Sequence, residues 1–187
     1  MSKLNILVAY PYLKQDIKDF ISSNKDKIRL LVDSGAYTAW KAGKEIQVDD
    51  YCKFISDLPF TPWRYFTLDV IGNPIQTKLN FRKMVRDLYT PIPIFTRGEK
   101  IEAIDDYYES SDCLGIGGLV ATKGNKGFVK GIMEVIGKRR VHWLGYTRIN
   151  FLKYYRPYSC DSSSWSMGLQ FGNLDIFMPS GEWTKIT

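Results

Sequence analysis

The sequence predicts an α/β protein: a compact, stripped-down TIM-type (β/α)8 barrel. Short apolar runs typical of buried strands alternate with longer segments whose apolar residues recur at helical spacing. Such alternation makes a parallel sheet with right-handed crossovers, and a count near eight strands favours a barrel over an open sheet. The 187 residues suit a single domain spanning residues 1–187, although a typical barrel of this kind needs about 250.

The expected elements follow one another in regular order. Strands are predicted at residues 4–9, 30–32, 65–68, 92–95, 114–116 and 141–144, with a seventh ending at Asp161 and an eighth at 174–178. Helices are predicted near residues 13–21, 48–58, 79–88, 101–108, 128–136 and 149–155. No helical crossover fits between Asp161 and Leu174. The last two strands are therefore expected to form a hairpin, or the barrel is incomplete.

Composition excludes several classes of protein. The 26 Lys and Arg exceed the 20 Asp and Glu, and this net charge of +6 suits a polyanionic partner without proving one. Cys52, Cys113 and Cys160 are widely spaced and His142 is the single histidine, so neither a disulfide framework nor a four-ligand zinc site is expected. The chain has no cleavage-site pattern near its start and no apolar run long enough for a membrane. A cytoplasmic protein is expected.

Three acids each end a predicted strand: Asp33, Asp69 and Asp161. Because the carboxyl ends of parallel strands meet at one end of a barrel, these acids are expected to share a site. Two facing carboxylates can divide glycosidic-bond chemistry, one attacking the anomeric carbon while the other moves protons. The alternative is that such an Asp caps the next helix or pairs with a lysine. Capping competes most strongly for Asp161, which precedes three serines.

Other residues admit two interpretations. Gly117-Gly118 could bring backbone close to a ligand or form a tight turn. His142 lies within a predicted strand, where it is either a buried structural histidine or a group that orients substrate and adjusts the proton affinity of Asp161. Basic residues around 123–130 and 138–140 could contact phosphates or only face solvent. The aromatic residues that could stack on a base, or belong to the core, are Tyr37, Trp40, Trp143, Tyr146 and Trp165.

Two motifs, in their order along the chain, resemble a known family. The run from Asp33 to Tyr37, Asp-Ser-Gly-Ala-Tyr, is similar to an Asp-Ser-Gly-Gly-Phe motif, and residues 144–147 are similar to a Gly-Val-Gly-Thr-like segment. Together with Asp69 and Gly117-Gly118, they resemble the tRNA-guanine transglycosylase superfamily over residues 30 to 170. The nearest resemblance is to short phage-encoded members that exchange guanine for a 7-deazaguanine in DNA.

This resemblance implies a role for each matching residue. Asp33 would be the general acid/base, Asp161 the nucleophile, and Asp69 a hydrogen-bonding partner of the base. The backbone of Gly117, Gly118 and Leu119 would receive the carbonyl oxygen of the base. The remaining residues that would bind substrate are Ser34, Gly35, Arg97 in place of a family glutamine, His142 and Trp165.

The resemblance also implies partners. They would be DNA, or alternatively tRNA, together with a 7-deazaguanine base, and no metal or other cofactor would be needed. The family's zinc module, part of the tRNA-docking surface, has no ligands in this chain, which favours DNA. A homodimer is possible, and a phage-encoded protein would work in the host cytoplasm. The alternatives are a tRNA enzyme, a non-catalytic nucleic-acid-binding barrel or, more distantly, a barrel for a small molecule.

Overall fold

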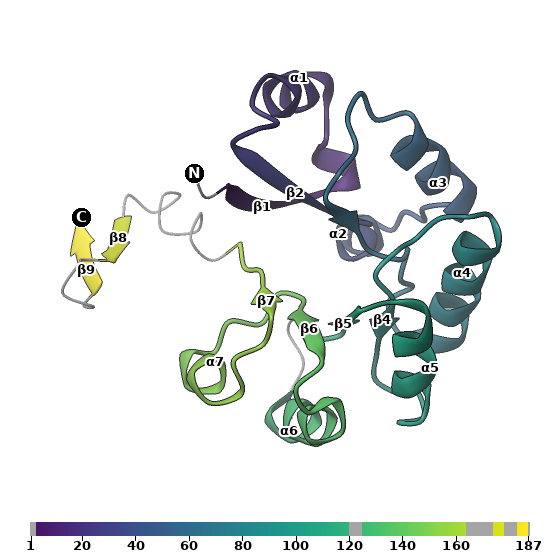
Figure 1. Ribbon diagram of the computed structural model, residues 1–187, viewed down its shortest axis with the longest axis vertical. Helices are drawn as coiled ribbons and strands as arrows, with labels where there is room; N and C mark the ends of the chain where they lie inside the picture. Colours follow the sequence, from purple (N-terminus) through teal and green to yellow (C-terminus); the bar gives the residue numbers. More distant parts are fainter. Residues whose placement is uncertain (1–2, 120–124, 164–173, 178–182, 187) are drawn as a thin grey trace.

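The computed structural model describes residues 3–119, 125–163, 174–177 and 183–186. Its central feature is a curved row of parallel strands with helices around the outside (Figure 1). One parallel sheet contains β1 (Leu4–Ala9), β2 (Ile28–Asp33) and β3 (Arg64–Tyr65). A second contains β4 (Ile94–Phe95), β5 (Cys113–Ile116), β6 (Arg140–Trp143) and β7 (Ser159–Cys160). A parallel bridge between Phe66 and Ile92 joins them, so the strands are ordered as in the sequence.

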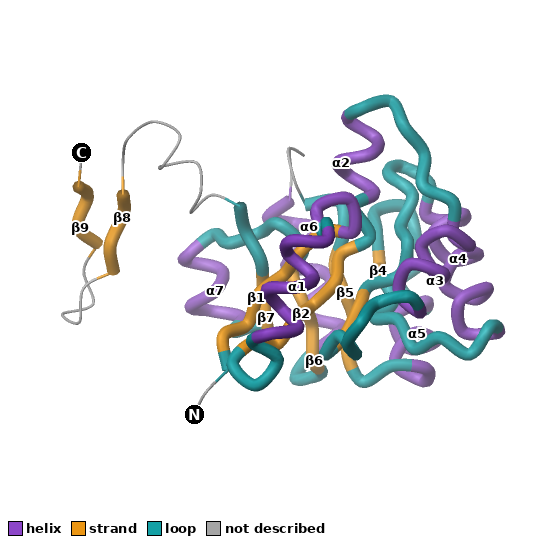
Figure 2. The backbone as a smooth tube through the Cα atoms, turned by 90° about the horizontal axis from the view of Figure 1, so that it is seen from above, coloured by secondary structure: helices purple, strands orange, loops and turns teal. Residues whose placement is uncertain are grey.

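Helices follow the strands as the alternating pattern predicts. The helical elements are η1 (Tyr10–Tyr12), α1 (Gln15–Ser23), α2 (Ala36–Lys41), α3 (Val48–Ser56), α4 (Pro74–Arg86), α5 (Ala103–Ser110), α6 (Asn125–Ile136) and α7 (Ile149–Tyr155). Helix α2 was not predicted, because six residues are too few to display a helical repeat. In the described part of the chain, no helix has the length and apolar character needed to span a bilayer. In Figure 2 the strands of the two parallel sheets lie inside the layer of helices.

The two faces of the strands pack against different neighbours. Val32 of β2 packs with residues of the surrounding helices, among them Tyr51 and Ile55 of α3. Leu31 belongs instead to a cluster supplied by strand segments alone, which also contains Phe66. Because side chains alternate along a strand, Asp33 shares the face of Leu31. The acid at the end of β2 therefore lies on the inner, concave side of the curved row of strands.

Closure into an eight-stranded parallel barrel is not confirmed. The predicted eighth strand exists as β8 (Leu174–Phe177), but it pairs antiparallel with β9 (Trp183–Ile186), a strand that the sequence did not predict. Within the described residues neither strand pairs with the parallel sheets, and no pairing joins β7 to β1. The expected hairpin between strands seven and eight is thus wrong: the hairpin is formed by β8 and β9.

Side chains at the amino ends of the strands hold the two sheets together. The Trp63 and Tyr158 rings, which precede β3 and β7, have centroids 6.5 Å apart. The Asp112 carboxylate binds Arg64, and also Arg140 at 2.7 Å. A cavity of about 790 Å³ opens at this end and is lined by Trp63, Arg64 and Asp112 among others. It lies at the opposite end of the strands from the three acids.

Candidate functional site

The turn after β2 connects two of the predicted acids. The N–H of Gly35 donates to Asp33 Oδ2 at 2.9 Å, which fixes the Asp33 carboxylate against its own backbone. The fully buried Ser34 hydroxyl donates to Asp69 Oδ1 at 2.9 Å. Ser34 Oγ also accepts the N–H of Ala36 at 3.3 Å, where α2 begins. Ser34 therefore holds the end of β2 against the segment that follows β3.

Gly35 is required at this turn by the backbone itself. Its φ is +76°, in the left-handed region, and a Cβ there would lie 2.8 Å from Pro11 Cγ. We expect Gly35→Ala to lower the free energy of unfolding by about 2–4 kcal/mol, since both the left-handed conformation and the overlap carry a cost. Gly43 is the matched control, because its φ is +64° and nothing lies within 4 Å of its Cβ position. Denaturant unfolding that gives equal losses for the two variants would contradict this explanation.

Burial and neighbouring charge change the protonation of Asp33. Burial of the carboxyl group, with smaller contributions from the negative charges of Asp69 and Asp161, raises its pKa to about 7. The N–H of Gly35 opposes this shift. Asp33 thus interacts electrostatically with both other acids, although Asp161 follows it by more than a hundred residues. A carboxyl group with a pKa near 7 can both donate and accept a proton at neutral pH.

Asp69 is also shifted away from the ordinary behaviour of an aspartate. Burial raises the pKa of its carboxyl group, while the hydrogen bond from Ser34 lowers it. Tyr51 lies near Asp33 and Asp69. Its hydroxyl donates to the Phe66 carbonyl at 3.0 Å, and burial raises the pKa of this hydroxyl. The sequence pattern predicts only that Tyr51 lies in the helix near residues 48–58. Through its hydrogen bond to Phe66, Tyr51 ties α3 to the segment between β3 and Asp69.

Asp161, which follows β7, is held by groups from the neighbouring strand β6 and from the segment just after it. His142 Nε2 lies 3.1 Å from Asp161 Oδ1, and the Gly145 N–H donates to the same oxygen at 2.9 Å. The Asp161 side chain keeps 26% of its surface exposed, against 3% for His142. Both contacts fall on Oδ1. The carboxylate is fixed at one oxygen and remains partly accessible.

His142 connects Asp161 to Ser159. Its Nδ1 lies 2.8 Å from Ser159 Oγ, and its ring packs 5.0 Å from the ring of Phe66 between centroids. An ionised carboxylate only accepts hydrogen bonds, so Nε2 carries the hydrogen when Asp161 is ionised. In the neutral imidazole Nδ1 then accepts the hydrogen of the Ser159 hydroxyl. His142 is thus the buried, hydrogen-bonded histidine of the first sequence interpretation, and a role in orienting substrate or adjusting the proton affinity of Asp161 stays a prediction.

Ser159 and Gly145 were absent from the predicted site. Ser159 begins β7 and lies two residues before Asp161, which directly follows that strand, so the two-residue alternation of an extended chain could have placed both on the same face. The contribution of Gly145 comes from its N–H, which no side-chain pattern reveals. The signal that could have indicated it is its place in the 144–147 segment, which carries part of the family resemblance.

The glycines after β5 differ from the expected carbonyl receptor. The N–H of Gly117 donates to the Phe95 carbonyl at 2.9 Å, continuing the sheet. A Cβ on Gly117 would lie 2.8 Å from Ile94 Cγ2, which is a packing reason for glycine. Gly118 is exposed, and the Leu119 side chain is buried in the core. Of the three, Gly118 is the one that presents backbone at the surface.

The remaining predicted substrate residues are Arg97 and Trp165. Arg97 is exposed, and its Nη2 donates to Asn125 Oδ1 at 2.7 Å, at the start of α6. Trp165 lies outside the described residues. Of the predicted stacking aromatics, Trp143 and Tyr146 are core residues with 0% and 5% exposure, whereas Trp40 is 57% exposed. Stacking by Trp143 or Tyr146 is therefore excluded by burial.

The site as a whole is an arrangement of acids with a histidine. Asp33, Ser34, Asp69, His142 and Asp161 come together at the carboxyl ends of β2, β3, β6 and β7. In the described part of the chain, no three His, Cys, Asp or Glu side chains are grouped so that they could hold a metal ion. Comparisons of this chain with family models, curated proteins and solved structures found no match.

Proposed function

We propose that this chain is a pentosyltransferase that replaces guanine in DNA with a 7-deazaguanine through a covalent Asp161–sugar intermediate. The observation that carries the proposal is the electrostatic interaction of Asp33 with Asp161 in one site, with the pKa of Asp33 raised to about 7. The division of labour between two carboxylates requires one that cycles its proton and one that stays ionised to attack. The proposed substrates, guanine in DNA and a 7-deazaguanine base, are taken from the sequence resemblance to the transglycosylase superfamily.

The first half-reaction breaks the bond to guanine. A guanine nucleotide extruded from the duplex enters the site. An oxygen of the Asp161 carboxylate forms a bond to C1′ while the C1′–N9 bond breaks, and the electron pair of that bond stays on N9. Asp33 in its acid form donates the proton that neutralises the departing guanine. The product is a sugar ester of Asp161.

The second half-reaction installs the new base. Asp33, now ionised, removes the N9 proton of the 7-deazaguanine, and N9 attacks C1′ from the side that guanine vacated. The bond to Asp161 breaks and the carboxylate is restored. Two inversions preserve the anomeric configuration. Asp69 and exposed backbone at Gly118 would hold the base during this step.

We also propose that the parallel strands belong to a (β/α)8-type barrel without a zinc module. Sequential order from β1 to β7 and uniformly parallel pairing support this. In such barrels the reacting groups lie at the carboxyl ends of the strands, which is where Asp33 and Asp161 stand. A cytoplasmic location and a homodimer stay predictions.

Base exchange is tested directly with the purified chain. It is incubated with duplex DNA or with tRNA, each with 7-cyano- or 7-aminomethyl-7-deazaguanine, and the nucleosides are analysed by mass spectrometry. We expect 7-deazaguanine nucleosides in the DNA and release of free guanine. Incorporation into tRNA alone would show that the substrate is RNA and not DNA. Tight DNA binding without guanine release for either base would favour a non-catalytic barrel and reject the enzyme.

His142 offers a prediction about how Asp161 is positioned. Loss of the Nε2 hydrogen bond in His142→Ala should lower kcat about 10- to 150-fold, the equivalent of a hydrogen bond of about 1.5–3 kcal/mol to a charged group. His142→Gln, whose amide can still donate to Asp161, should recover most of this loss. KM for DNA should change little in both variants. If Ala and Gln reduce kcat equally, the hydrogen bond is not what positions Asp161.

A further inference from the structure

We propose that four exposed cations, Lys41, Arg97, Lys126 and Arg148, form a cationic rim that binds the phosphates on either side of the extruded nucleotide. This inference rests on the proposed function and adds to it the surface that receives the DNA backbone. All four side chains are exposed to solvent.

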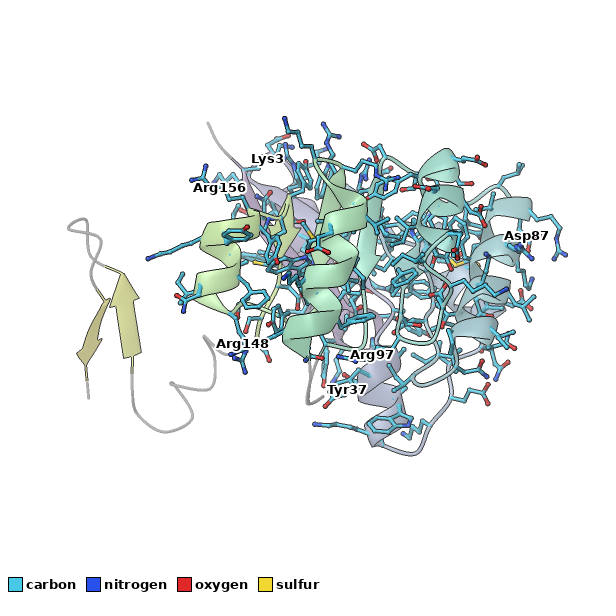
Figure 3. All side chains as sticks on the ribbon, turned by 90° about the horizontal axis from the view of Figure 1, so that it is seen from below. Lys3, Tyr37, Asp87, Arg97, Arg148 and Arg156 are labelled. Atoms are coloured by element: carbon cyan, nitrogen blue, oxygen red, sulfur yellow. The ribbon has the colours of Figure 1, made fainter. Side chains whose placement is uncertain are left out.

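The rim is defined by where these residues stand along the fold. Arg97 follows β4, Lys126 is at the start of the helix after β5, Arg148 follows β6, and Lys41 ends the helix after β2. Figure 3 shows Arg97 and Arg148 at one end of the molecule together with Tyr37 of α2. Because the strands are parallel, this is also the end at which Asp33 and Asp161 stand.

The charges on the rim are not neutralised by the protein. None of the four takes part in an ion pair within the described residues, whereas Arg139 and Arg140, at the other end of β6, bind Asp105 and Asp112. Two glutamates accompany the rim. Glu45 is exposed. Glu99 is turned inward, accepting the Thr96 N–H at 2.8 Å and the Tyr107 hydroxyl at 2.7 Å. The four cations outnumber the two glutamates, so the rim keeps a net positive charge.

Arg97 is held in place before any ligand arrives. Besides its bond to Asn125, its guanidinium lies 4.4 Å from the centroid of the Phe128 ring. Asn125 in turn donates to the Leu119 carbonyl at 2.5 Å, so the loops after β4 and β5 are joined at this point. Lys126 is the next residue. A guanidinium fixed in this way loses less entropy on binding phosphate. The structure assigns Arg97 to the DNA backbone rather than to the base.

Charge complementarity explains why a rim is needed. The three acids at the centre repel the phosphates of any strand that brings a sugar to Asp161. Cations around the acids attract those phosphates at the periphery, while the sugar and base enter between them. Most of the affinity of proteins for DNA comes from such phosphate contacts, and it depends on salt.

One aromatic residue extends the rim. Trp40 is exposed, and its ring centroid lies 6.0 Å from that of Tyr37. Lys41, the next residue, places its Nζ 4.8 Å from the Tyr37 centroid. An exposed indole beside a phosphate-binding cation can stack on a base next to the extruded one.

The test measures binding of a guanine-containing DNA duplex over a series of salt concentrations. A plot of log K against log salt has a negative slope. Each of the variants Arg97→Gln, Lys126→Gln and Arg148→Gln should make this slope shallower by about 0.9, which corresponds to the loss of one phosphate contact. Trp40→Ala should weaken binding by about 1–3 kcal/mol, or about 5- to 150-fold, without changing the slope. The matched control is Lys138→Gln, which removes one exposed charge just before β6, at the other end of the strands. Its slope should equal that of the unmodified chain.

The outcomes separate this inference from the proposed function. Equal slopes for the rim variants and Lys138→Gln, or no DNA binding at low salt, would overturn the rim. If the unmodified chain exchanges bases and the rim slopes are unchanged, the rim alone fails. If the salt dependence of DNA binding becomes shallower in the rim variants and the unmodified chain exchanges no base, the proposed function fails while the rim holds. Circular dichroism of each variant confirms that it is folded.

Discussion

Replacing Asp161 with Asn should abolish base exchange and leave the fold intact. The amide oxygen of Asn can still accept from the Gly145 N–H and from His142, so the local structure is preserved. An amide oxygen is too weak a nucleophile to attack C1′, and we expect exchange to fall by at least about a thousandfold. Mass spectrometry of nucleosides measures the loss.

The same substitution tests the covalent intermediate. The unmodified chain, incubated with DNA and then denatured, should carry a nucleotide adduct on the peptide containing Asp161, and Asp161→Asn should carry none. Asp50→Asn removes an exposed acid from α3 and should behave as the unmodified chain. Full activity in Asp161→Asn would reject the nucleophile and with it the proposed mechanism.

Asp33→Asn should lose activity and gain stability. The amide cannot exchange the proton that both half-reactions need, so exchange should fall by about 10²–10⁴-fold. The free energy of unfolding should rise instead, because the variant no longer buries an ionised carboxylate close to Asp69 and Asp161. Groups arranged for chemistry commonly carry a cost in stability of this kind.

The gain in stability should depend on pH in a defined way. The pKa of Asp33 rises from 3.8 in the unfolded chain to about 7 in the fold, so between these values the folded state binds the extra proton. The Asp33 contribution to stability therefore falls as pH rises from about 4 to 7 and is constant above. Asp33→Asn should match the unmodified chain near pH 4 and exceed it at pH 8, by on the order of 4 kcal/mol.

Denaturant unfolding of both proteins at several pH values measures this difference. Asp50→Asn again serves as the control, since its side chain is exposed and should give no such trend. A stability difference that does not grow with pH would show that Asp33 is already ionised in the fold at low pH. The pH dependence of exchange should then also lack a group titrating near 7.

Much of the architecture could be read from local patterns. Alternating apolar runs located β1 through β7 in order, because strands that are covered on both faces must be apolar throughout. The same reasoning placed Asp33, Asp69 and Asp161 at one end of the strands. What local patterns missed was short or non-periodic: six-residue α2 and strand β9. The antiparallel pairing of β8 was also missed, because a strand's pattern does not name its partner.

The chain's residue order was enough to select the acids, since a carboxylate that ends a buried apolar run can stand only at the mouth of the sheet. It could not decide how each acid is held. The bonds from Ser34 to Asp69 and from His142 to Asp161 join residues 35 and 19 positions apart. Such bonds form only when strand register brings the two backbones together and packing fixes each rotamer. These contacts, like the turn of Arg97 toward Asn125, exist only in the folded molecule.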